Sequence, residues 1–408
     1  MKMKKALAAL LILALLLPLA ACVGAKESGA PAATAAPTAA QTEETAAPAA
    51  ATPRPGEENA PKIDGLVYER TVENLYADQF TIYCYEGGYR FIDMVSSEQM
   101  LVVPEGGSVP KGLGKDVVVV QQPLNNIYLV STSCMALFDA LDALERIAFV
   151  GTKQWYIENA VTALENGTFA YAGKYNAPDY EMLISGSCEL AIESTMILHN
   201  PEVKEKLIEI GIKTIVERSS YEDHPLGRTE WIKVYGALLG LEEEADAAFL
   251  AEVDKIRGLE ELDSTGKTVA FFYVNTAGNV VTYKSQGYIP AMISIAGGEY
   301  IFSDLGTDED SKLSSINMSM EQFYHSAVKA DFIIYNCSIV DQLNSVDELT
   351  DLSPVLSDFK AVKEGNAWCT RESMFQQTDK MGTIIQEMNK IFTGQSSGSD
   401  LTYIFRLE

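Results

Sequence analysis

One stretch decides the fold: residues 241–263, LEEEADAAFLAEVDKIRGLEELD, predict a single long helix. Four apolar residues lie on one stripe of that helix: Ala245, Phe249, Val253 and Ile256. Acidic residues occupy its other faces, and neither proline nor glycine interrupts the stripe. At about 1.5 Å per residue this helix is expected to be roughly 30 Å long, which is enough to cross a small domain.

Short apolar strands alternate with amphipathic helices on both sides of this helix. Before it, the strand-like runs are residues 117–120, 127–130, 147–150, 181–184, 190–193 and 213–217. After it, strands are predicted at 268–274 and 332–336, and helices at 289–296, 322–329 and 379–392. Such alternation is typical of a largely parallel sheet covered on both faces. The predicted fold class is therefore α/β, with two Rossmann-like β/α lobes joined by the single long α-helix.

An N-terminal β-hairpin extension precedes the first lobe. Residues 80–86 and 89–94 are strand-like, and Gly87-Gly88 between them supplies the positive φ that a tight turn needs. The predicted parts of the chain are a signal peptide (1–21), a linker (22–61), an N-terminal lobe with the hairpin extension (62–240), the interlobe helix (241–263) and a C-terminal lobe (264–408).

The chain begins like a secreted protein. Lysines within residues 1–5 precede an apolar run over residues 6–19, which is the pattern of a signal peptide. The sequence LAAC at residues 19–22 resembles the lipobox of bacterial lipoproteins, which implies cleavage before Cys22 and a diacylglycerol anchor on its thiol. The alternative is an ordinary signal peptide with an incidental cysteine. Residues 25–61 are rich in alanine, proline and threonine and predict a disordered, extended stalk.

Composition excludes several classes of protein. The 408-residue chain has 31 Lys+Arg against 57 Asp+Glu, a formal net charge of −26. This acidity argues against a nucleic-acid-binding protein and against adhesion to an anionic membrane through a basic face. Only three histidines occur, which excludes a His-rich metal site. Of the six cysteines, five follow Cys22 without any CxxC pair, so free thiols are predicted rather than a disulfide framework or a zinc cluster.

No enzymatic activity is predicted, because the chain has no HExxH motif, no P-loop and no GxGxxG after a strand. Two glutamates at predicted helix N-termini are candidate functional residues. Glu230 falls in the first turn of one helix, and Glu321 follows Ser319 in a capping-box pattern. Acids at such positions also stabilise an ordinary helix by about 0.3–1 kcal/mol, so the residues alone leave both a functional and a structural role open.

Residues 220–233, SYEDHPLGRTEWIK, resemble the segment before the linker helix in solute-binding proteins of the ABC importers for iron-siderophores, haem and vitamin B12. Three further segments are similar to the second lobe of that family: IAGG at 295–298, SME at 319–321 and ADFII at 330–334. The resemblance covers residues 123–392. It implies the two-lobed fold with a helical backbone, and small lobe motion because the linking helix is stiff.

In that family, one glutamate on each lobe docks with arginines of the membrane permease. The resemblance implies this role for Glu230 and Glu321. Region 63–115 lies outside the resemblance, and no role is assigned to it.

Ligands of open β/α sheets bind beyond the carboxyl ends of the strands. The candidate ligand-binding residues at those positions are Ser133, Trp155, Tyr156, Tyr283, Lys284, Tyr288, Arg371 and Met374. Their aromatic rings offer stacking area, and their cations complement carboxylates or an anionic iron chelate. Tyr156, Tyr288 and Met374 are candidate axial ligands for haem. Trp155 and Met374 are equally well explained as packing residues.

The predicted function is a membrane-tethered, extracytoplasmic solute-binding protein that delivers a bulky ligand to an ABC importer. A ferric siderophore ranks first as the ligand, followed by cobalamin or another corrinoid and by haem. The predicted partners are the permease with its ATPase, the ligand, and the membrane through Cys22. Nucleic acid is not expected as a partner, and neither is a resident cofactor or metal. The protein is expected to be a monomer. The alternatives are a ligand-sensing lipoprotein and an extracellular enzyme acting on a tetrapyrrole.

Replacing Cys22 by Ala should release the protein from membranes, because the lipidated thiol is the predicted anchor. Cell fractionation followed by immunodetection, with the unaltered chain as control, measures the effect. Retention of the Cys22→Ala variant in the membrane fraction would contradict the lipobox.

Overall fold

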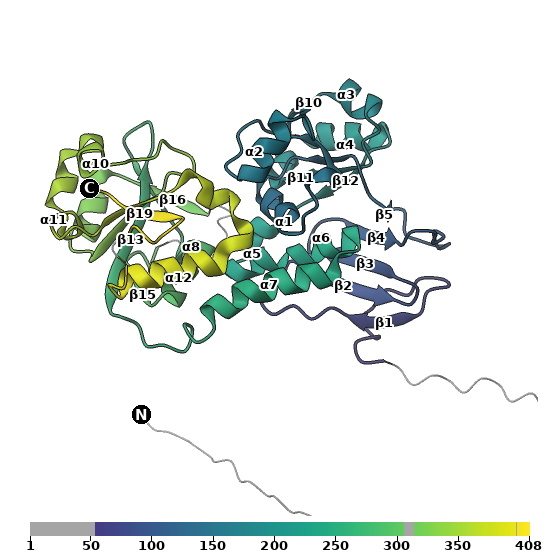
Figure 1. Ribbon diagram of the computed structural model, residues 1–408, viewed down its shortest axis with the longest axis horizontal. Coiled ribbons are helices and arrows are strands. Elements are labelled where there is room, and N and C mark those ends of the chain that lie inside the picture. The colour runs from purple at the N-terminus through teal and green to yellow at the C-terminus, as the bar shows by residue number, and fades with distance from the viewer. Residues whose placement is uncertain (1–53, 306–313, 397) are drawn as a thin grey trace, which may run out of the picture. The chain divides into compact units, whose positions relative to one another are not determined.

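The computed structural model of the chain describes residues 54–305, 314–396 and 398–408. The predicted signal peptide, the lipidation site Cys22 and most of the predicted linker lie outside these residues. The described residues form three large sheets with their covering helices (Figure 1). In this part of the chain, no helix combines the length and the apolar character that a bilayer crossing requires.

The first lobe is built on a five-stranded parallel sheet of order β12-β11-β6-β7-β8. Its strands are β6 (Ile127–Leu129), β7 (Ile147–Val150), β8 (Ala170–Tyr171), β11 (Leu190–Glu193) and β12 (Lys213–Val216). Its helices are α1 (Met135–Ala140), α2 (Glu158–Glu165), α3 (Tyr180–Ser185) and α4 (Pro201–Glu209), and a small ribbon pairs β9 (Gly173–Lys174) with β10 (Ala177–Pro178). The predicted parallel sheet of this lobe is confirmed.

The second lobe contains a mixed sheet of order β16-β14-β13-β17-β18-β19, with β15 beside β13. Its parallel strands are β13 (Lys267–Val274), β15 (Gly298–Tyr300), β17 (Phe332–Tyr335) and β18 (Ala367–Thr370). The other three strands each pair antiparallel with a neighbour: β14 (Val280–Tyr283) with β13, β16 (Ser315–Met318) with β14, and β19 (Ile404–Arg406) with β18. The helices are α8 (Tyr288–Ile295), α9 (Met320–Ala327), α10 (Val346–Leu352), α11 (Lys360–Lys363) and α12 (Met381–Phe392). The helices predicted at 289–296, 322–329 and 379–392 are confirmed to within two residues.

The N-terminal extension is a complete sheet rather than one hairpin. It comprises β1 (Tyr68–Thr71), β2 (Phe80–Tyr85), β3 (Tyr89–Met94), β4 (Gln99–Val103) and β5 (Val117–Gln121). The predicted hairpin is its centre, with β2 antiparallel to β3 and φ of 80° and 88° at Gly87 and Gly88. The strand predicted at 117–120 belongs to this sheet, where it pairs with β4, and not to the β/α sheet of the first lobe.

One predicted strand is wrong. Residues 181–184 lie in helix α3, whose first N–H groups are capped by Asp179: its side chain accepts a hydrogen bond from the backbone N of Met182 at 3.0 Å. A four-residue apolar run does not distinguish a strand from one turn of buried helix, so periodicity alone was not decisive here.

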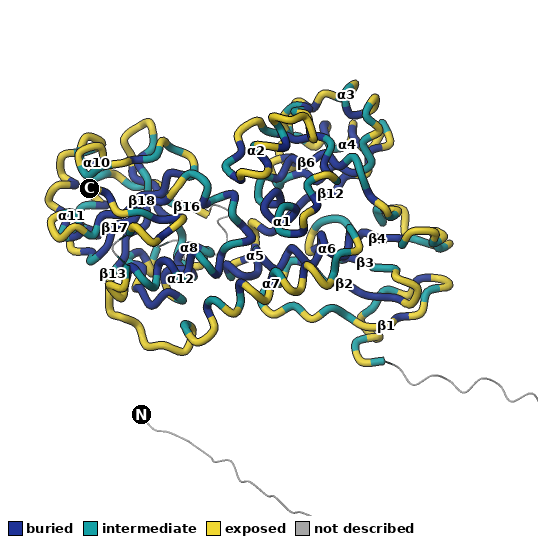
Figure 2. The backbone as a smooth tube through the Cα atoms, viewed as in Figure 1, coloured by how far each residue is buried: buried dark blue, intermediate teal, exposed yellow. Residues whose placement is uncertain are grey.

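Three successive helices connect the lobes: α5 (Pro225–Glu230), α6 (Ile232–Leu239) and α7 (Glu242–Ile256). The predicted interlobe helix is therefore real but shorter than residues 241–263, because the chain leaves the helix at Arg257 and turns at Gly258, whose φ is 85°. The predicted apolar stripe is buried at Ala245, Phe249 and Ile256, whereas Val253 is only partly buried and Glu252 lies buried beside it. Figure 2 shows the buried and exposed sides of α7 along its length.

Helix α7 packs between α6 and α12, and glycine makes both contacts possible (Figure 1). A Cβ added at Gly236 of α6 would lie 2.6 Å from the Cβ of Ala245 on α7. A Cβ added at Gly382 of α12 would lie 2.2 Å from the backbone oxygen of Glu252 on α7. The Glu252 carboxylate also accepts a hydrogen bond from the backbone N of Thr383 at 2.8 Å. The backbones of the three helices are thus in close contact, and α7 ties the first lobe to the second.

Two buried glutamates attach the N-terminal sheet to these helices. The Glu230 carboxylate accepts hydrogen bonds from the backbone N atoms of Leu75, Tyr76 and Ala77 at 2.7–2.8 Å, and from Lys233 Nζ at 2.7 Å. The Glu222 carboxylate continues this pattern along the chain and accepts from the next two backbone N atoms (Asp78 and Gln79) and from Trp231 Nε1. Five consecutive N–H groups of the β1–β2 connection therefore bind two carboxylates of the resembling segment 220–233.

The prediction that Glu230 docks with a permease is wrong for this structure. Its side chain is fully buried, and its oxygens are engaged by the partners just described. A docking residue must reach an arginine of another protein, whereas Glu230 would have to break a buried ion pair with Lys233 before it reached the surface. Its role is to hold the N-terminal sheet against α5 and α6.

Replacing Gly382 by Ala should destabilise the protein by about 1–3 kcal/mol, because the new Cβ forces α12 away from α7. Gly114→Ala is the matched control, since a Cβ there meets its nearest neighbour, Val117, at an ordinary 3.6 Å. Urea unfolding followed by circular dichroism gives both free energies. Equal unfolding free energies for the two variants would contradict the close-contact interpretation.

Replacing Glu230 by Gln should cost about 3–5 kcal/mol of unfolding free energy, because Lys233 is then left buried without its counter-charge. Adding Lys233→Met to Glu230→Gln should recover part of the loss. The control is Glu243→Gln, an exposed acid on α7. An effect of Glu230→Gln no larger than that of the control, measured by the same urea titration, would refute the anchoring role.

Candidate functional site

The first cavity lies at the carboxyl ends of four parallel strands of the first lobe. It has a volume of about 430 Å³ and is lined by residues that directly follow β6, β7, β11 and β12. Most of these residues carry hydroxyl groups: Ser131, Thr132, Ser133, Thr152, Ser194, Thr195 and Ser220. These polar residues lie at the rim because each apolar strand ends there, and the residues that follow a strand leave the apolar core.

A second cavity, of about 260 Å³, lies between the two lobes. The first lobe contributes Thr132, Thr152, Gln154 and Tyr156, and the second contributes residues 337–341, Glu372, Phe375 and Gln376. Because Thr132 and Thr152 line both cavities, the two are contiguous. Together they form the interlobe site at the carboxyl ends of β6, β7, β17 and β18.

Gln376 connects the lobes across this site. Its side-chain oxygen accepts a hydrogen bond from the backbone N of Tyr156 at 2.8 Å, and its Nε2 donates to the backbone oxygen of Gln154 at 3.1 Å. The side chain is almost fully buried, so both bonds are shielded from water. One amide therefore bridges the two walls of the cavity.

The floor of the first cavity is a hydroxyl cluster around Glu217. The hydroxyls of Ser131 and Ser133 each lie 3.1 Å from Glu217 Oε2 and 2.9 Å from each other. The backbone N of Ser219 donates to Glu217 Oε1 at 2.6 Å. Glu217 is buried, and these donors hold its charge in place.

A second buried acid lies beside this floor without a partner. Glu193 ends β11, its side chain is fully buried, and neither carboxyl oxygen has a hydrogen-bond partner among the described residues. Burial raises the pKa of Glu193 to about 8. Its carboxyl group is therefore largely protonated at neutral pH.

The structure brings two of the eight predicted ligand-binding residues to the interlobe site, Ser133 and Tyr156. Trp155 and Met374 are buried in the apolar core, at 6% and 5% exposure. Tyr283 is partly buried, and its hydroxyl accepts a hydrogen bond from Asn336 Nδ2 at 2.6 Å.

Three other predicted residues, Lys284, Tyr288 and Arg371, line neither cavity. The guanidinium of Arg228 lies 3.7 Å from the ring centroid of Tyr288, and that of Arg371 lies 4.7 Å from the ring centroid of Phe405. Arg371 is exposed but lies over an aromatic ring rather than along the cavity wall. The cations expected to complement an anionic chelate are thus not part of the interlobe site.

Glu217, Gln376 and Cys337 were not among the individually predicted site residues. Glu217 directly follows strand β12, so the rule that located Ser133 would have found it. Gln376 belongs to a short 3-10 turn (Glu372–Gln376) that no periodicity indicates. Cys337 and Cys369 are buried neighbours at the ends of β17 and β18, and the hydrogen bond between them lowers the pKa of Cys337.

Five described cysteines are free, and four of them are buried, as predicted: Cys84, Cys134, Cys337 and Cys369 are buried and Cys188 is partly buried. Among residues 54–305, 314–396 and 398–408, no group of three or more His, Cys, Asp or Glu side chains is arranged to hold a metal ion.

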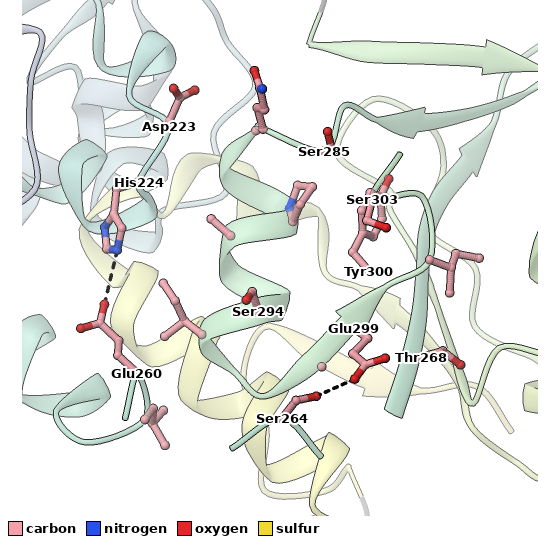
Figure 3. Close-up of a pocket in the computed structure, with 18 of the residues that line it drawn as sticks. Asp223, His224, Glu260, Ser264, Thr268, Ser285, Ser294, Glu299, Tyr300 and Ser303 are labelled. Carbon is pink, nitrogen blue, oxygen red and sulfur yellow. Dashed lines mark hydrogen bonds and ion pairs between the residues drawn. The ribbon is translucent and has the colours of Figure 1, made fainter. Parts of the chain in front are cut away.

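A larger cavity, of about 1110 Å³, lies elsewhere, along α8 and β15 (Figure 3). It adjoins the amino-terminal half of β13 rather than the carboxyl ends of the strands. Figure 3 shows His224 pointing toward Glu260, with Nε2 3.5 Å from Oε1. His224 Nδ1 accepts a hydrogen bond from the backbone N of Leu226, and its ring stacks on Tyr76 at 4.2 Å. Burial lowers the pKa of His224, so it acts as a neutral helix cap.

Two exposed glutamates occupy equivalent places in the two lobes. Glu321 is in the first turn of α9, behind the Ser319–Gln322 capping box that the sequence predicted, and α9 leads into the parallel strand β17. Glu181 is in the first turn of α3, which Asp179 caps, and α3 leads into the parallel strand β11. Each glutamate is the second residue of its helix. The incorrect strand prediction at 181–184 concealed this correspondence.

A family model and two curated relatives match this chain. The family model described as "Periplasmic binding protein" matches residues 127–372. Two relatives from Methanocaldococcus jannaschii, the uncharacterized lipoproteins MJ0878 and MJ0872, are 24% and 23% identical; they align with 78% and 82% of this chain and with 79% and 86% of their own lengths.

Solved structures share the fold at low sequence identity. A periplasmic haem-binding protein from Pseudomonas aeruginosa has a TM-score of 0.54 at 13% identity, covering 70% of this chain and 98% of that protein. A periplasmic binding protein from Veillonella parvula has a TM-score of 0.54 at 16% identity, covering 78% and 98%. With the family model matching more than half of the sequence, the chain belongs to the periplasmic binding protein family.

Proposed function

We propose that this protein is a lipid-anchored, extracytoplasmic solute-binding protein that captures a bulky ligand between its lobes and delivers it to an ABC importer permease. The observation that carries the proposal is the interlobe site: two contiguous cavities with polar walls, at the carboxyl ends of strands from both lobes. Binding in such a crevice is the usual arrangement for open β/α sheets.

The proposed ligands are those of the resembling importers: a ferric siderophore, a corrinoid or haem. Support for this class comes from the haem-binding protein that shares the fold. The combined cavities are also large enough to enclose much of a ligand of this size.

The proposed anchor is a diacylglycerol group on Cys22. The two curated relatives are named lipoproteins, which supports this part of the proposal. An anchor and an extended stalk would keep the binding lobes near a permease in the same membrane.

For docking we propose Glu321 on the second lobe and Glu181, in place of Glu230, on the first. Both side chains are exposed, both lie in the first turn of a capped helix, and both are therefore free to pair with arginines of a partner. The choice of Glu181 rests on its correspondence with Glu321, since each helix precedes a parallel strand of its own lobe.

The double variant Glu181→Lys/Glu321→Lys should bind ligand normally and fail to support its uptake, because two docking anions become cations facing the permease arginines. Growth of the source cells on the ligand, combined with the affinity of the purified variant, separates the two effects. The control is Glu205→Lys/Asp351→Lys, which reverses one exposed acid on each lobe outside the two docking positions.

Undiminished uptake by the docking variant would contradict the proposed delivery and would favour a sensor, which does not need these two residues. Lost ligand affinity would also contradict the docking role, because it would mean that the substitutions act on the binding site.

A further inference from the structure

We infer that the interlobe site selects a neutral or cationic ligand that presents N–H or O–H donors, and that it discriminates against anionic chelates. This inference rests on the proposed function and narrows its ligand class. It follows from two properties of the cavity walls, their charge and their remaining hydrogen-bonding capacity.

The charge of the walls is negative. Three carboxylates line the two cavities: Glu217, Asp341 and Glu372. Lys174 is the one cation among the described lining residues. An anion entering this crevice meets like charges that water screens incompletely, and the formal charge of −26 on the whole chain adds to the repulsion.

The hydrogen-bonding capacity of the walls also favours a ligand that carries donors. Each serine hydroxyl has one hydrogen to donate. Ser131 and Ser133 lie within bonding distance of Glu217 Oε2 and of each other, so both of their hydrogens are used inside the cluster. What the two oxygens still offer a ligand is acceptor capacity.

The interlobe part of the site adds further acceptors. Asp341 and Glu372 accept hydrogen bonds but do not donate them when ionised. The oxygen of Gln376 is already bonded to Tyr156, and one hydrogen of its Nε2 is bonded to Gln154. The other lining hydroxyls, such as those of Thr132, Thr152 and Ser194, can donate or accept, so the acids and the Ser131–Ser133 pair are the wall groups that favour a ligand with donors of its own.

These properties separate the proposed ligand classes by chemistry. Neutral or cationic ferric hydroxamates carry amide N–H groups, and corrinoids carry amide side chains on a cationic cobalt ring. Both supply donors without net negative charge. Ferric catecholates are multiply anionic and haem carries propionate carboxylates, so both present acceptors and like charge to an acceptor-rich, acidic crevice.

Isothermal titration calorimetry on the purified full-length protein in detergent tests the inference with four probes: ferrioxamine B, diaquacobinamide, ferric enterobactin and haemin. We expect one of the two cationic probes to bind at least about tenfold more tightly than either anionic probe. Tighter binding of ferric enterobactin or haemin than of both cations would overturn the inference while leaving the proposed function intact. Binding of none of the four would count against the proposed function, and the inference would fall with it.

A charge-neutralising variant, Asp341→Asn/Glu372→Gln, tests the cause of the selectivity. It should narrow the affinity ratio between the best cationic and the best anionic probe by about tenfold, because it removes two wall anions and adds amide donors. The control is Asp351→Asn, an exposed acid on α10 that lines neither cavity. An unchanged ratio in the wall variant, with circular dichroism like that of the parent chain, would contradict the inference.

Discussion

The contact on which the rest of the structure depends is the packing of α7 between α6 and α12. Gly236 and Gly382 allow the helix backbones to approach so closely that either added Cβ would collide with α7. The lobes are therefore joined by a packed three-helix unit rather than by a flexible strand. We expect such a junction to permit only small relative movements of the lobes, which would leave the interlobe site largely formed before a ligand arrives.

The same unit also holds the N-terminal sheet. Burying a carboxylate is costly unless donors replace its water, and Glu222 and Glu230 obtain those donors from five consecutive backbone N–H groups and from Trp231 and Lys233. The segment that most resembles a family motif is thus structural here. Its glutamates fasten the extension to the helices that connect the lobes.

The interlobe site was only partly predictable. Ser133 and Tyr156 were found because they follow strands, and residues that follow parallel strands meet at one edge of a sheet. The expected cation Arg371 was not found there, because its guanidinium lies over the ring of Phe405. Gln376 joins the lobes across 220 residues of chain to Tyr156, and no local pattern records such a contact.

Periodicity along the chain was enough to predict the α/β class, most of the strands, the hairpin turn at Gly87-Gly88 and a helix between two lobes, because burial of one face imposes a repeat on consecutive residues. Tertiary structure alone decided whether a given acidic side chain is exposed on the surface or buried and hydrogen-bonded in the interior. The sequence predicted both Glu230 and Glu321 in the first turn of a helix, but Glu230 is the last residue of α5, and only Glu321 lies in a first turn, that of α9. Only Glu230 accepts a hydrogen bond from a backbone N–H group 155 residues away in the sequence, and such bonds replace water around its buried carboxylate. The side chain of Glu321 remains exposed to solvent.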